Sequence, residues 1–155
     1  MDWTTVLQYD LPYLHPVVVH APIALLIAAA GAAAGYAAVG RRPWRTATLA
    51  LLVAGAAGAW AAGQTGEVLE DAVEGDPQVE VLIETHEAAA AWTLYMSLAG
   101  ALAFAGATVA LRRRSAASAD PLALRIALFL PALAAALLVA YAGHVGGLMV
   151  WGVPR

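Results

Sequence analysis

Four long apolar segments, each nearly free of charged residues, constrain this chain more than any other feature. A helix of about 20 apolar residues crosses the hydrocarbon core of a bilayer, and each segment approaches or exceeds that length. Only 12% of the residues are charged, whereas soluble domains carry about 25%. We therefore predict an all-α fold, an integral membrane four-helix bundle that forms one domain over residues 1–155. The predicted spans are residues 16–39, 46–62, 86–111 and 122–145.

The charged residues predict the orientation of these spans. Ten of the eleven acidic residues lie at one end of the predicted bundle, and only Asp120 stands among the arginines. The positive-inside rule places the arginines in the cytoplasm, and both chain termini on the outer, periplasmic side. We expect a multi-pass protein of the bacterial inner membrane, with an acidic outer loop at residues 63–85. The arginines that border the two inner connections are Arg41, Arg42, Arg45, Arg112, Arg113, Arg114 and Arg125.

Local signals mark the expected ends of the helices. Residues 1–14 carry aromatic and acidic side chains, which are typical of a segment at the membrane surface. Gly63-Gln64-Thr65-Gly66 is expected to end the second span. Asp76-Pro77 and Asp120-Pro121 each read as an N-cap followed by proline at the first helical position.

The composition excludes several functions. The chain has no cysteine, so disulfides, thiolate-bound metals, iron–sulfur clusters and covalently attached haem are excluded. No phosphate-binding loop, nucleophile elbow or dinucleotide fingerprint is present. The arginines act as topology signals, so no nucleic-acid partner is expected. The middle of every span lacks ionisable residues, which argues against a channel or a pump.

All four histidines are predicted to lie at the outer face. With a helical rise of 1.5 Å per residue, His20 lies about 31 Å from Arg41 and His144 about 28 Å from Arg125. His15 and His86 lie about 39 Å from the arginines that anchor their spans. The histidines thus form two tiers, with His20 and His144 just inside the outer leaflet.

This arrangement predicts one haem b. A histidine in apolar membrane is costly unless it is paired or ligating, and four-helix bundles build cofactor sites from facing helices. His20 and His144 at matching depth are the expected axial ligands, with His15 and His86 close by. Glycines beside His144 leave room for a flat macrocycle, and a second stacked haem would be too crowded. The expected cofactor-binding residues are His20, His144, His86, His15, Gly143 and Gly147.

Two other classes of protein stay open. The same histidines, with Glu84 or Glu87, suit a site for zinc, copper or non-haem iron, with His20, His144, His86 and His15 as metal ligands. A cofactor-free scaffold or assembly subunit would use its histidines only for hydrogen bonds between helices. His15, which precedes Pro16, also suits a helix cap.

The predicted haem implies electron transfer, and an enzymatic, quinol-linked activity stays open. The bilayer surrounds the bundle, and its glycine faces allow a homodimer. A haem near the outer surface would exchange electrons with a periplasmic cytochrome c, a Rieske-type protein or quinol. The acidic residues Glu70, Asp71 and Glu74 would attract a basic partner of this kind.

Two motifs resemble those of a known family. Leu14-His15-Pro16-x-x-Val19-His20-x-Pro22-Ile23 opens the first span, and Gly143-His144-x-Gly146-Gly147-x-Met149-Val150 closes the last. They resemble the motifs of a bacterial family of four-span membrane proteins, domain of unknown function 2231, with Gln64-Thr65-Gly66 and His86 at its intermediate motifs. Trp151 stands where tyrosine is expected. The resemblance implies a four-span fold, and the fusion of some members to Rieske-type or cytochrome c-type domains suggests electron transfer.

Overall fold

The computed structural model describes residues 14–73, 77–115 and 118–152. The predicted surface segment at residues 1–14 therefore lies outside the described residues, except for Leu14. The described part of the chain contains helices and no strands. Four of its helical stretches are long and apolar enough to cross a membrane. The helices are α2 (His15–Val18), α3 (His20–Val39), α4 (Arg42–Val73), α5 (Pro77–Ala110) and α6 (Leu122–Trp151).

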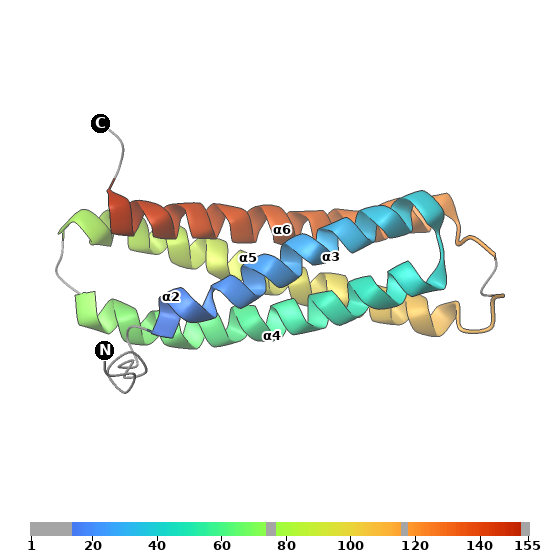
Figure 1. The fold of residues 1–155 in the computed structure, drawn as a ribbon, viewed down its shortest axis with the longest axis horizontal. Helices are drawn as coiled ribbons and strands as arrows, with labels where there is room; N and C mark the ends of the chain where they lie inside the picture. Colours follow the sequence, from blue (N-terminus) through green and yellow to red (C-terminus); the bar gives the residue numbers. More distant parts are fainter. Residues whose placement is uncertain (1–13, 74–76, 116–117, 153–155) are drawn as a thin grey trace, which may run out of the picture.

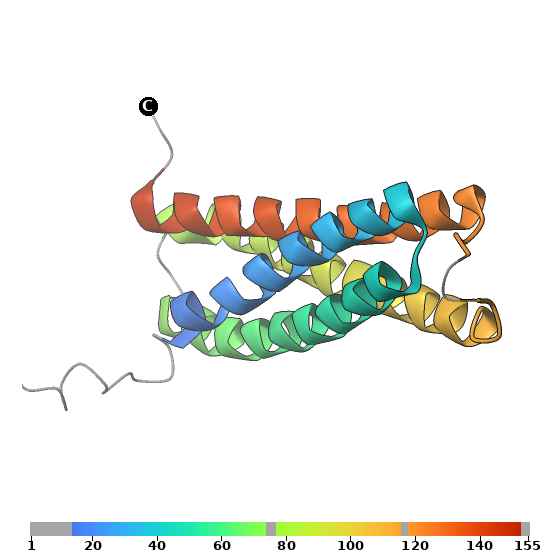
Figure 2. The same cartoon turned by 45° about the vertical axis from the view of Figure 1, so that its right-hand side comes forward.

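The long helices form the predicted four-helix bundle (Figure 1). α3 and α5 each pack against both α4 and α6, so α3 and α5 face each other diagonally. One end of the bundle holds the α3–α4 and α5–α6 connections, and we call it the arginine end. The other holds α2, the end of α4, the start of α5 and the end of α6, and we call it the histidine end. Figure 2 shows the same arrangement from a second direction.

The first predicted span is divided into two helices. α2 ends at Val18 and α3 begins at His20. Pro22 has no backbone N–H, so the carbonyl of Val18 loses its partner one helical turn earlier and the helix breaks there. α2 lies against α4 at the histidine end, whereas the far end of α3 lies beside the start of α6 (Figures 1 and 2).

The helix that contains the second predicted span, α4, is longer than predicted. The expected stop at Gly63-Gln64-Thr65-Gly66 is wrong, because α4 continues through these residues to Val73. The acidic stretch at 63–85 is therefore mostly helical rather than a loop, and α5 begins at Pro77 as its proline indicates. A glycine in a helix interior lowers the stability of the helix by about 1 kcal/mol relative to alanine. The close contact of Gly66 with His15 gives a reason for this glycine.

A network of buried polar groups holds the arginine end together. Arg45 forms an ion pair with Asp120, and both side chains are at most 5% exposed. The hydroxyl of Tyr36 donates a hydrogen bond of 2.8 Å to the same carboxylate. The backbone N–H of Asp120 donates to the carbonyl of Gly40 at 2.9 Å, so the starts of α4 and α6 are tied to the end of α3.

This network corrects the predicted role of Asp120. The structure shows no side-chain cap on α6, which begins at Leu122 after Pro121. The carboxylate instead pairs with Arg45, and that pairing accounts for the one acidic residue among the arginines.

We expect Asp120→Asn to destabilise the bundle. Removal of one partner of a buried ion pair costs about 3–5 kcal/mol because the other charge is left uncompensated. Thermal unfolding in detergent should show a clear fall in Tm. The double variant Arg45→Met/Asp120→Leu should recover much of it, and Glu80→Gln, at an exposed position of α5, should change little. A wild-type Tm for Asp120→Asn would contradict this role.

Candidate functional site

His15 is held by α4. Its ring is partly buried, and Nδ1 lies 2.9 Å from the carbonyl oxygen of Ala62 and 3.1 Å from the hydroxyl of Thr65. A carbonyl only accepts hydrogen bonds, so Nδ1 carries the proton and donates it. In the neutral ring Nε2 then bears the free lone pair. The ring forms its hydrogen bonds with α4 and caps no helix end, so the helix-cap interpretation of His15 is wrong.

His86 is held by α6 in the same way. Its Nδ1 lies 2.9 Å from the carbonyl oxygen of Ala142, and the ring is partly buried. The same argument places the proton on Nδ1 and the lone pair on Nε2. Ligating histidines commonly show this state, because a carbonyl that accepts from one ring nitrogen orients the other toward the metal.

A repeated motif forms the two histidine sites. Ala62-Gly63-x-x-Gly66 on α4 matches Ala142-Gly143-x-x-Gly146 on α6. The alanine supplies the carbonyl in each case, and the last glycine supplies the space. A Cβ at Gly66 would lie 3.1 Å from Cε1 of His15, and one at Gly146 would lie 3.2 Å from Cε1 of His86. The bundle thus contains two equivalent half-sites, one on each helical hairpin.

The two half-sites meet across the bundle. The ring centres of His15 and His86 are 6.1 Å apart, and the ring planes are 79° from parallel. All the hydrogen bonds that these rings make within the described part of the chain use Nδ1. Neither Nε2 atom therefore has a hydrogen-bond partner there, and the two rings meet between α2 and α5.

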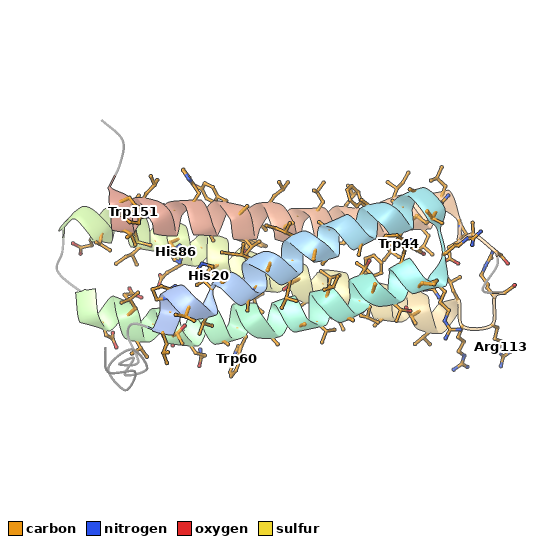
Figure 3. The ribbon with its side chains drawn as sticks, in the orientation of Figure 1. His20, Trp44, Trp60, His86, Arg113 and Trp151 are labelled. Carbon is orange, nitrogen blue, oxygen red and sulfur yellow. The ribbon has the colours of Figure 1, made fainter. Side chains whose placement is uncertain are left out.

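His20 and His144, the predicted axial ligands, are placed differently. Both side chains are exposed on the outside of the bundle, although they lie at the histidine end as expected. Figure 3 shows His20 and His86 in the same half of the molecule, with Arg113 at the far end. The pairing in the structure therefore joins His15 to His86, and the ring contacts include none between His20 and His144 among the described residues.

The sequence argument missed this pairing for a geometric reason. Counting residues from the arginines gives the height of a side chain along the bundle, but not its direction around the helix. His20 follows His15 by five residues, which corresponds to about 140° around a helix axis. One ring faces the core and the other cannot. The repeated Ala-Gly-x-x-Gly motif was the signal that identifies the core-facing pair.

The small residues near the site have separate roles. Gly146 makes room for His86, whereas nothing lies within 4 Å of a Cβ built at Gly147. A Cβ at Gly143 would be in ordinary contact with Ile23. Below His86, Thr93 and Ser97 are buried in the core and bond to the backbone of their own helix. The buried side chains on the part of α5 that follows His86 are therefore small.

Carboxylates do not complete a metal site here. Glu84 and Glu87 are exposed, although they flank His86 in the sequence. No group of three or more histidine, aspartate or glutamate side chains converges to hold a metal within residues 14–73, 77–115 and 118–152. The described donors near the core are therefore the two Nε2 atoms.

Comparison with known proteins places the chain in a family. Residues 12–153 match the family described as "Predicted membrane protein (DUF2231)". The chain belongs to this family. No curated protein and no solved structure matches the chain. The match confirms the family that the sequence resemblance indicated, and the family description names a membrane protein without a reaction.

The hydrogen bonds of the site predict the protonation of its histidines. In protein free of haem and metal, the ¹⁵N NMR signals of His15 and His86 should show the proton on Nδ1. Substitution of each histidine by glutamine assigns its signal. His20→Gln and His144→Gln should leave the other two signals unchanged. Protonation of His15 and His86 at Nε2 would contradict the geometry.

Proposed function

We propose that this protein is a membrane b-type cytochrome. His15 and His86 would be the axial ligands of one haem, through which the protein transfers electrons. The observation that carries the proposal is the 6.1 Å between their ring centres. Two imidazoles bound on opposite sides of one metal have centres about 6.2 Å apart, given bonds of about 2.0 Å and about 1.1 Å from nitrogen to ring centre. The spacing fits trans ligation.

The anchoring of both rings supports the same conclusion. Each Nδ1–H donates to a helix carbonyl, which fixes the tautomer and the ring orientation that a haem ligand needs. Gly66 and Gly146 let each ring approach its neighbouring helix closely. The small buried side chains of Ala89 and Thr93 below His86 reduce the bulk that a macrocycle would meet.

The geometry supports haem better than a zinc, copper or non-haem iron site. Tetrahedral ligation would bring the two ring centres to about 5 Å and would normally require two further ligands. The described residues supply no third carboxylate or histidine at the pair. A haem requires only two protein ligands, because the porphyrin supplies the other four.

The first test is an absorbance spectrum of the detergent-purified protein, oxidised and dithionite-reduced, with the haem quantified. We expect a Soret band and about one haem per chain. His15→Ala and His86→Ala should lose the spectrum, whereas the matched variants His20→Ala and His144→Ala should keep it. His86→Met should retain a ligand and raise the reduction potential, which separates loss of ligation from misfolding.

Each result of that test is decisive. A featureless spectrum from cells with ample haem would reject the cytochrome. Loss of the spectrum only in the His20 and His144 variants would reject the His15–His86 pair and restore the pair expected from the sequence. Circular dichroism of each variant reports whether the helices are intact.

The acidic residues at the histidine end indicate the kind of redox partner. Exposed carboxylates on both α4 and α5 form an acidic crown, our name for the acidic surface at this end. Glu74, one of the residues predicted to attract the partner, lies outside the described residues. Complementary charge raises association rates through electrostatic steering. The partner that fits is a small basic electron carrier, such as a cytochrome c. The exposed carboxylates are Glu67, Asp71, Glu80, Glu84 and Glu87.

Neutralisation of part of this crown should slow the reaction with a basic carrier. The triple variant Glu67→Gln/Asp71→Asn/Glu80→Gln should react about tenfold more slowly at low ionic strength, with a flatter salt dependence. Stopped-flow oxidation of the reduced protein by a basic cytochrome c measures it. Arg112→Gln/Arg113→Gln, at the opposite end, is the control and should keep the wild-type slope. An unchanged slope in the triple variant would reject the docking surface.

A further inference from the structure

An open groove lies on the outside of the bundle between α5 and α6, close to His86. It is a shallow groove with a volume of about 410 Å³. Trp92 lines it from α5, and Leu138 and Tyr141 line it from α6, while Glu84 and Thr85 form its polar part. All of these residues belong to the candidate membrane spans, so the groove opens on the lipid-facing surface.

The groove has the chemistry of a site for an amphiphilic ring compound. Trp92 is 54% exposed and Tyr141 is 51% exposed, so both present aromatic surface to a ligand. The indole of Trp92 packs edge-on against Tyr95, at 5.9 Å between ring centres, which restrains its orientation. Glu84 and Thr85 lie about two helical turns nearer the histidine end than Trp92 and supply hydrogen-bonding oxygens. A carboxylate at this position repels the phosphate of a phospholipid.

The position of the groove connects it with the proposed haem. Ala89 lines the groove, is only 5% exposed and follows His86 by one turn of α5. Thr85, which also lines the groove, directly precedes His86. A ring bound in the groove would therefore be separated from His86 by about one helix diameter, about 10 Å, which is short enough for direct electron transfer.

We propose that this groove binds a membrane quinol and that Glu84 accepts its hydroxyl protons. The inference rests on the proposed function and names the electron donor. One quinol loses two electrons and two protons, both O–H bonds break, and a quinone is left. A haem held by His15 and His86 would accept the two electrons one at a time and would pass each to the basic carrier before accepting the next. Glu84 lies at the histidine end of the groove, between the exposed carboxylates Glu80 and Glu87, and would pass each proton on to the water at that end.

Binding is tested by a method that requires no haem. The protein is placed in nanodiscs and titrated with a ubiquinone analogue that carries a ten-carbon tail, which quenches tryptophan fluorescence. Saturable quenching should be strongly reduced in Trp92→Phe and kept in Trp60→Phe, an exposed tryptophan on α4 outside the groove. Equal quenching in the two variants, or linear quenching without saturation, would show only partitioning into lipid and would overturn the site.

Electron donation is tested separately on the haem-loaded protein. We expect Glu84→Gln to slow reduction of the haem by the quinol form of the analogue about tenfold, with the dithionite-reduced spectrum unchanged. Arg113→Gln, at the exposed arginine end and not part of the groove, is the control and should react at the wild-type rate. A wild-type rate in Glu84→Gln would overturn the proton acceptor. Absence of haem would reject the cytochrome and leave the binding test standing.

Discussion

The requirement that polar groups in a membrane find partners within the protein determines how this bundle is built. In lipid the backbone N–H and carbonyl groups form hydrogen bonds with each other within helices. A polar side chain must therefore find a backbone group that can still form another hydrogen bond. Each helix carbonyl has a second lone pair. His15 and His86 use that lone pair on Ala62 and Ala142. The same bond that satisfies Nδ1 leaves Nε2 free, so each ring is held in one orientation with an unused lone pair.

The two ends of the bundle solve the problem of polarity differently. At the arginine end, Asp120 brings the charge of Arg45 and the hydroxyl of Tyr36 together, and these bonds join α3, α4 and the segment before α6. At the histidine end, each ring has a nitrogen with no described partner. The polar groups of the arginine end therefore hold helices together, whereas those of the histidine end hold helices together and also leave one nitrogen of each ring without a described partner.

The sequence predicted the four spans, the gathering of the histidines at one end and the start of α5 at Pro77. It did not predict the histidine pair, because height along a helix leaves the direction of a side chain undetermined. It also placed a stop at Gly63-Gln64-Thr65-Gly66, since glycines near polar residues resemble the end of a helix. Contact with His15 gives Gly66 its role inside α4 instead. Asp120 looked like a helix cap because its buried partner, Arg45, is 75 residues away.

The repeated half-site also explains why two histidines belong to the pair and two do not. The hairpins α3–α4 and α5–α6 run in the same direction, so a rotation about an axis along the bundle relates them. That rotation exchanges His15 with His86 and Gly66 with Gly146. It places Ala91 where His20 stands and Gln64 where His144 stands, so the exposed histidines have no counterparts. A ligand held equally by both hairpins needs equivalent donors from each, and only the inner pair supplies them. The exposed histidines therefore make the outer surfaces of the two hairpins different. The groove beside Trp92 is a second such difference, because residues of the α5–α6 hairpin line it. A symmetric interior with unequal outer faces suits a protein that holds one cofactor at its centre and receives electrons from one side.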